Sequence, residues 1–269
     1  MTGLLLRLAG PLQSWGERSA FTAVRDTAGF PTRSGLIGIF AAAQGLARGA
    51  SLARYEALEI TVRVDRPGTL LIDYHTVGGG QPAHLTAATS GGKNKGAAVV
   101  TRRQYLADAA FVVAVTGPGD QITELAAALT HPHWAPYLGR RSCPPDEPFL
   151  LRSDVEDPVA ELLTTVPLTS PHTDDRRTRA PIARPDTSVD FLWERPPSGQ
   201  STTATPLTVQ DRPVTFAQHG RSHGKRHLYR TTEQLPAGLL PRGDRALHDR
   251  LIDYAAADAE RPQSTEYTA

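Results

Sequence analysis

The sequence predicts an α+β domain whose elements follow in the order strand, helix, strand, strand, helix, strand (βαββαβ). Three observations favour this class: short apolar runs typical of strands, two segments with apolar residues at helical spacing, and the alternation of the two kinds up to about residue 150. This order is typical of the ferredoxin-like scaffold, which is also a common RNA-binding platform.

The predicted strands are runs of apolar or alternating residues bounded by turn residues. The expected strands are residues 3–9, 58–65, 69–77 and 107–115, and the segment 148–153 is a candidate for a further one.

Two helices are expected from apolar residues three and four positions apart. Residues 32–47 form the first, which Thr32 or Ser34 could cap and Gly49 could end. Residues 118–131 form the second, capped by Asp120. The residues expected on their buried faces are Leu36, Ile39, Phe40, Ala43 and either Leu46 or Ala47 in the first, and Ile122, Leu125, Ala126 and Leu129 in the second.

A Gly-, Ser- and Ala-rich stretch, residues 78–103, interrupts this pattern. It offers little apolar surface to bury, so we expect an excursion that projects from the domain. It contains Lys93, Lys95, Arg102 and Arg103, and no acidic residue lies between Asp73 and Asp108. This favours a phosphate-bearing partner, and an ordinary surface loop is the alternative.

The second half of the chain gives weaker signals. Residues 1–152 are expected to form the main domain, residues 153–254 a Pro-rich, β-rich or irregular region, and residues 255–269 a disordered tail.

Charge placement is more informative than net charge, which is only +1. Acidic residues are also absent between Asp26 and Glu56 and between Glu124 and Asp146, so three acid-free windows could fold into one positive surface. All basic residues except Lys93, Lys95 and Lys225 are Arg. Arg suits bidentate phosphate contacts, although a GC-rich genome would give the same bias.

Several classes of protein are disfavoured. The single cysteine, Cys143, allows no internal disulfide and no cysteine-based metal cluster. We expect a cytoplasmic protein, because the N-terminus does not resemble a signal peptide and no apolar run is long enough for a membrane span. His219, His223 and His227 are spaced four apart, but Gly220 and Gly224 weaken a helix there, so a basic surface is favoured over zinc. No metal or cofactor is expected.

Two short stretches point to RNA. Gln13, Ser14 and Trp15 follow the Gly10-Pro11 turn after the first strand, and we expect the Trp15 indole to be partly exposed and to stack on a base. Arg140 and Arg141 follow Gly139 on a tight turn, where paired guanidinium groups suit a phosphate or a partner's carboxylate.

The ordered motifs LRLAGPLQSWG, FPTRSGLIGIFAAAQG, DYHTV, RQYLADAAFVVAV and YLGRRSCP resemble the CasD family, the family-five Cas proteins of type I-E CRISPR Cascade complexes. The resemblance covers about residues 3–150 and, more weakly, HGRSHGKRHLYR. It implies an RRM-like fold of the repeat-associated (RAMP) type with a basic thumb hairpin at residues 78–103, and a non-catalytic subunit that caps the crRNA 5′ handle. Its implied partners are the Cascade backbone subunit, the large subunit and, through the assembled complex, target DNA. No membrane partner is implied.

Carried over by position, the RNA-binding residues would be Gln13, Trp15, Arg33, Ser34, His75, Lys93, Lys95, Arg102, Arg103, Tyr105, Arg140 and Arg141. Two other functions stay open. One is a metal-independent endoribonuclease that processes pre-crRNA, for which His75, Tyr74, Tyr105 and Lys93 are the available acid–base groups. The other is an adaptor that binds only protein.

Overall fold

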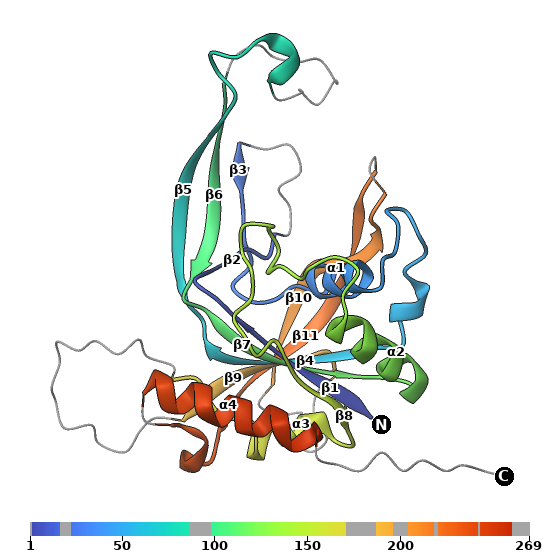
Figure 1. Ribbon diagram of the computed structural model, residues 1–269, viewed down its shortest axis with the longest axis vertical. Coiled ribbons are helices and arrows are strands. Elements are labelled where there is room, and N and C mark those ends of the chain that lie inside the picture. The colour runs from blue at the N-terminus through green and yellow to red at the C-terminus, as the bar shows by residue number, and fades with distance from the viewer. Residues whose placement is uncertain are drawn as a thin grey trace, which may run out of the picture.

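The chain forms a large sheet with helices on both faces and a long hairpin that projects from it (Figure 1). The computed structural model describes residues 2–16, 23–86, 98–170, 187–195, 204–217, 220–241 and 243–259. The large sheet has seven strands in the order β10-β11-β9-β4-β7-β1-β8. Their bounds are β1 Gly3–Ala9, β4 Glu59–Arg66, β7 Ala110–Thr116, β8 Leu150–Val155, β9 Ser188–Trp193, β10 Thr205–Thr215 and β11 Ser222–Gln234.

The first half of the chain supplies four of these strands, β4, β7, β1 and β8, which lie side by side and are antiparallel to their neighbours. Helix α1 (Arg33–Ala43) lies between β1 and β4 in the chain, and α2 (Gly119–Thr130) lies between β7 and β8. The predicted strands at 3–9, 58–65, 107–115 and 148–153 and the predicted helix at 118–131 are therefore present, with bounds shifted by up to three residues.

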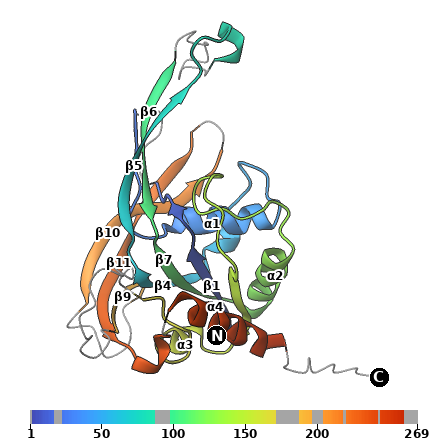
Figure 2. The same ribbon diagram turned by 60° about the vertical axis from the view of Figure 1, so that its left-hand side comes forward.

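Both faces of the large sheet are buried at β1, which explains why this strand is a continuous apolar run instead of an alternating one. Leu4, Leu6 and Leu8 pack with residues of α1 and α2 in one core. Leu5 points the other way, into a second core formed with α3 (Pro158–Thr164) and α4 (Asp244–Ala259). Figures 1 and 2 show these two helix pairs on opposite sides of the sheet.

Helix α1 begins where the sequence predicts and ends earlier. The Thr32 hydroxyl caps it by accepting a hydrogen bond from the Gly35 amide at 3.2 Å. The helix ends at Ala43 instead of Ala47, because Gly45 adopts a φ of +70° and turns the chain away.

The projecting hairpin is longer than predicted. Strand β5 (Thr69–Val77) pairs along its whole length with β6 (Val99–Ala107), and the short strands β2 (Leu12–Gln13) and β3 (Val24–Arg25) pair with the other edge of β6. The segment 69–77 is therefore an arm of the hairpin and not a strand of the main sheet. Residues 87–97, with Lys93 and Lys95, lie outside the described residues.

The C-terminal strands continue the main sheet, because β9 pairs with β4 through residues 61–64. Helix α4 extends to Ala259, so the first residues of the predicted tail are helical. The Pro-rich segments at 171–186 and 196–203 and residues 260–269 lie outside the described residues.

Candidate nucleic-acid interface

Three strands of the smaller sheet place basic side chains side by side. In the register of this sheet, Arg25 of β3 pairs with Arg103 of β6, and Arg103 pairs with Asp73 of β5. Directly paired residues project from the same face of a sheet. We call this the basic face; it carries Arg25, Arg103, Tyr105 and His75.

Arg140 completes the basic face from a separate turn. Its guanidinium carbon lies 4.5 Å from the centroid of the Tyr105 ring, a cation–π contact. Its Nη2 donates to the Arg25 carbonyl oxygen at 3.2 Å, which joins the turn to β3. Its Nη1 is buried and has no hydrogen-bond partner among the described residues, which leaves a charged donor that an anion would satisfy.

Gly139 makes this turn possible. It has a φ of +83°, and a Cβ there would lie 1.7 Å from the Ser14 carbonyl oxygen. The Ser14 amide donates to the Leu138 carbonyl oxygen at 3.0 Å. The chain after β1 therefore fixes the position of the turn that carries Arg140 and Arg141.

Several arginines on and around the basic face have no neighbouring carboxylate partner in the part of the chain that the structure describes, although Asp73 lies on the same face in register with Arg103. Among the described residues, Arg102, Arg103, Arg140 and Arg141 form no ion pair. Asp73 lies 3.8 Å from His75, and both side chains are partly exposed. Arg102 and Arg141 are exposed, and Arg103 and Arg140 are partly exposed.

The prediction that Trp15 is exposed is wrong. Its side chain is 1% exposed and packs against α1, where a Cβ on Gly35 would lie 2.7 Å from the indole. Its Nε1 donates to the Gln13 side-chain oxygen at 3.0 Å. The Gln13 amide in turn donates to the Leu8 and Ala109 carbonyl oxygens, each at 2.9 Å.

The side chains of Gln13 and Trp15 are therefore part of the protein core. The Gly10-Pro11 turn folds the chain back so that the residues after it pair with β6. The polar residues beside Trp15 in the sequence suggested a surface loop. Gln13 is nevertheless buried, because its side chain makes hydrogen bonds inside the protein. Neither side chain is available to a ligand in this structure.

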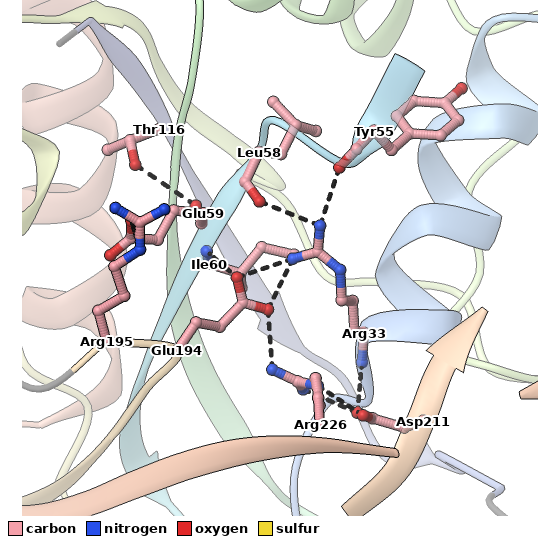
Figure 3. Close-up of polar contacts among 10 residues, drawn as sticks. All are labelled: Arg33, Tyr55, Leu58, Glu59, Ile60, Thr116, Glu194, Arg195, Asp211 and Arg226. Carbon is pink, nitrogen blue, oxygen red and sulfur yellow. Dashed lines mark hydrogen bonds and ion pairs between the residues drawn. The ribbon is translucent and has the colours of Figure 1, made fainter. Parts of the chain in front are cut away.

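Arg33 and Ser34 are also buried, against the prediction that they contact RNA. The Arg33 Nη1 donates to both carboxylate oxygens of Glu194, at 2.6 and 2.7 Å, and its Nη2 donates to the Tyr55 and Leu58 carbonyl oxygens (Figure 3). The Arg33 amide donates to Asp211 at 2.7 Å. Ser34 lies 3.4 Å from the Thr32 hydroxyl at the helix cap.

Arg226 joins the same network. It donates to Asp211 from Nε and Nη2 and to Glu194 from Nη1 (Figure 3). The acidic partners of Arg33, Glu194 and Asp211, thus lie more than 150 positions along the chain, so no local pattern could predict them.

Tyr105 is 6% exposed, so it supports Arg140 instead of offering an open ring to a base. Tyr105 and His75 share the basic face but lie four residues apart in register, and Tyr74 projects from the opposite face. Three of the four groups considered for acid–base chemistry therefore do not converge; Lys93 lies outside the described residues.

The opposite face of the hairpin is apolar and exposed to solvent. The sequence did not predict this exposed apolar surface. Its exposed side chains are Val24, Leu70, Ile72, Tyr74 and Val100, each at least 41% exposed. We call this the apolar face; Arg102 projects from it beside Val24 and Tyr74. The run TLLIDYHTV is as apolar as a buried strand, so composition gave no signal that it is exposed.

Other kinds of site are not found in the part of the chain that the structure describes. No group of three His, Cys, Asp or Glu side chains there could hold a metal ion. Of the helices searched in those ranges, none is long and apolar enough to cross a membrane.

Comparison with known proteins gives matches over most of the chain. A family model described as CRISPR-associated protein (Cas_Cas5) matches residues 3–229. The protein named CRISPR system Cascade subunit CasD, from Escherichia coli (strain K12), is 40% identical over 180 residues, which is 61% of this chain and 77% of that protein.

Two solved structures have a similar fold. A chain of a CRISPR RNA-guided surveillance complex superposes with a TM-score of 0.80 and 44% identity, over 94% of this chain and 99% of that chain. The structure titled Crystal structure of Cas protein gives a TM-score of 0.59 and 30% identity, over 90% of this chain and 98% of that one.

Proposed function

Because the chain belongs to the Cas5 family of CRISPR-associated proteins, we propose that it is a non-catalytic RNA-binding subunit of a type I-E Cascade surveillance complex, acting in the cytoplasm in antiviral defence. It would cap the 5′ handle of crRNA with the basic face of its hairpin. The observation that carries this proposal is Arg140, whose buried Nη1 lacks a partner among the described residues and which lies beside Arg25 and Arg103.

The chemistry of the basic face suits a phosphate backbone. Guanidinium groups offer paired donors to phosphate oxygens, and the guanidinium group of Arg140 lies over the Tyr105 ring. Exposed Arg141 extends the positive charge beside Arg140, whereas Arg102 projects from the opposite face of the hairpin. Gln13, Trp15, Arg33 and Ser34 position the surrounding elements and are not proposed as RNA contacts.

The fold proposed for this function is RRM-like, of the ferredoxin type. The antiparallel order β4-β7-β1-β8, with α1 and α2 as connections, supports it. The β5–β6 hairpin would be the thumb, an insertion between the second and third strands of this motif.

The apolar face supports the proposal that the subunit joins others. Large exposed apolar patches mark interaction sites, and a hairpin that projects from its domain has little of its own chain to cover them. We place the Cascade backbone and large subunits as the partners of the hairpin and its surroundings, with target DNA reached through the assembled complex.

Binding of repeat-derived RNA by the full chain, measured against salt concentration, tests the handle site. Arg103→Ala with Arg140→Ala should lower affinity and reduce the slope of log K against log salt by about 1.4, since each contact to single-stranded phosphate contributes about 0.7. Arg245→Ala with Arg250→Ala removes equal charge from α4, on the opposite side of the large sheet, and should leave the slope unchanged. A slope unaffected by the first pair would contradict the assignment.

The same RNA incubated with the chain in EDTA distinguishes a binding subunit from an endoribonuclease. We expect intact RNA, because Tyr105 is buried and His75 and Tyr74 lie on opposite faces. Discrete products ending in 2′,3′-cyclic phosphate would support the processing enzyme.

A further inference from the structure

A second basic surface lies at the C-terminal end of α1, apart from the hairpin. It is formed by the loop after α1, by the segment leading to Arg140, and by the tip of the β10–β11 hairpin. We call it the α1-end surface and define it by Arg48, Tyr137, Phe216 and Arg221.

Three segments meet at this surface. The hairpin tip approaches the loop after α1, since a Cβ on Gly49 would lie 4.0 Å from the Cα of Ala217. The segment after α2 lies on the end of α1, where the His133 amide donates to the Ala43 carbonyl oxygen at 2.9 Å. Figures 1 and 2 both show the neighbouring ends of β10 and β11 near the loop that follows α1.

Each of these segments lacks acidic residues in the sequence. No Asp or Glu occurs between Asp26 and Glu56, between Glu124 and Asp146, or between Asp211 and Glu233. The fold therefore brings together three stretches of chain that carry cations without carboxylates, which is the arrangement that a polyanion requires.

The cations on this surface are close to one another and exposed. The guanidinium carbon of Arg221 lies 4.9 Å from the centroid of the Phe216 ring. Partial burial of the guanidinium against its neighbours and, after it, the charge of Arg48 lower the pKa of Arg221, and Tyr137 opposes this shift. Among the described residues, neither Arg48 nor Arg221 forms an ion pair.

Aromatic groups accompany these cations, which favours nucleic acid over an acidic protein as the ligand. The Arg221 guanidinium group lies over the Phe216 ring, and Tyr137 is near enough to affect the pKa of Arg221. Trp134, on the segment that lies against α1, is 49% exposed and contacts His133 edge-to-face at 4.5 Å. Rings interleaved with arginines suit the bases and phosphates of a nucleic-acid strand.

We propose that the α1-end surface is a second phosphate-binding site, which contacts the backbone of a nucleic-acid strand beyond the basic face of the hairpin. Tyr137 lies three residues before Arg140, so the two sites are joined by one short segment. This inference rests on the proposed function in taking nucleic acid as the ligand, but it concerns residues to which that function assigns no role.

The test is equilibrium binding of the full chain to repeat-derived RNA of increasing length, and to single-stranded and duplex DNA, at several salt concentrations. Arg48→Ala with Arg221→Ala should reduce the salt slope for long single strands by about 1.4 and leave the shortest bound RNA unaffected. Arg48→Lys with Arg221→Lys keeps the charge and should restore most of the slope. An effect confined to RNA identifies crRNA as the ligand, and an effect on DNA identifies a target strand.

The controls separate failure of this inference from failure of the proposed function. Arg245→Ala with Arg250→Ala should bind like the wild type, and thermal unfolding of each variant shows whether it is folded. Unchanged slopes for Arg48→Ala with Arg221→Ala, while Arg103→Ala with Arg140→Ala weakens binding, would overturn the second site alone. No binding of any nucleic acid by the wild-type chain would overturn both.

Discussion

At the scale of single residues, the polar side chains near the first strand stabilise the core of the protein. Gln13 is fully buried and links the Trp15 indole to two backbone carbonyl oxygens. A buried amide with all these bonds made rigidifies its surroundings, because leaving any of them unmade is costly.

Trp15→Ala should therefore lower the free energy of unfolding by about 3–5 kcal/mol, the usual cost of deleting a buried aromatic ring. RNA binding by the folded fraction should be unchanged. Urea denaturation measures the free energy of unfolding. RNA binding at a low temperature, at which the variant is folded, measures the affinity. Trp134→Ala, at an exposed ring, is the control and should change stability by less than about 0.5 kcal/mol. Loss of RNA affinity without loss of stability in Trp15→Ala would restore the base-stacking role.

Tyr55 gives the protein a sensitivity to alkaline pH. Burial raises the pKa of Tyr55 to about 12, with Arg54 opposing and Glu124 adding to the shift, and its hydroxyl donates to Gln44. Since the unfolded chain ionises near pH 10, the stabilisation is complete below about pH 10 and is lost as the pH rises toward 12. Tyr55→Phe should flatten the fall of the free energy of unfolding between about pH 10 and about pH 12.

Denaturant unfolding at several pH values checks this expectation, with Tyr74→Phe at an exposed ring as the control. Tyr254, whose pKa burial and Glu161 also raise, contributes to the same alkaline loss and is present in both variants. An identical pH dependence in wild type and Tyr55→Phe would show that Tyr55 does not titrate as described.

At the scale of elements, the buried charge network joins α1 to the C-terminal hairpin. Ion pairs and hydrogen bonds connect four residues of this network: Arg33 at the start of α1, Asp211 of β10, Arg226 of β11 and Glu194 just after β9 (Figure 3). The network holds β10–β11 against α1, and so it also sets the position of the hairpin tip that carries Arg221.

Arg33→Ala should lower the free energy of unfolding by about 3 kcal/mol or more, because it leaves Glu194 with fewer partners in a buried site. Chemical denaturation measures this, and limited proteolysis should reveal easier cleavage within β10–β11. The matched control is Arg54→Ala, whose ion pair with Glu124 is exposed and should contribute less than about 1 kcal/mol. Equal small effects from the two substitutions would show that the network is not stabilising.

The elements of the first half could be predicted because each is buried and carries a hydrophobic period. Strands β1 and β7 are apolar runs covered on both faces, and α2 has one apolar stripe. Strands β10 and β11 gave no such signal, since most of their residues are exposed or partly exposed. Strand β5 misled for the opposite reason: its sequence is that of a buried strand, and most of its side chains are exposed.

The candidate site was predicted in part. Its arginines were proposed because they lie in acid-free windows, as Arg103, Arg140 and Arg141 do. The buried roles of Gln13, Trp15, Arg33 and Ser34 were not, because burial depends on partners distant in sequence. Arg25 was missed for the same reason: its place on the basic face comes from pairing between β3 and β6.

At the scale of the whole molecule, the protein consists of a body built on the large sheet and a hairpin that projects from it (Figure 1). The large sheet has a core on each face, and the strands of the second half extend it instead of forming a separate sheet. The hairpin has a basic face and an apolar face. The α1-end surface lies apart from the hairpin, at the C-terminal end of α1 (Figure 2). This arrangement is the one that the proposed function requires, with a nucleic-acid strand on the basic face and neighbouring subunits against the apolar face.

The most direct test of RNA binding by the basic face is photo-crosslinking in the assembled complex, with 4-thiouridine placed along the 5′ handle and the crosslinked peptides identified by mass spectrometry. The account predicts crosslinks in residues 99–107 of β6 and in residues 137–142, around Arg103 and Arg140. Crosslinks found only on α3, α4 or the face of the large sheet that they cover would contradict it.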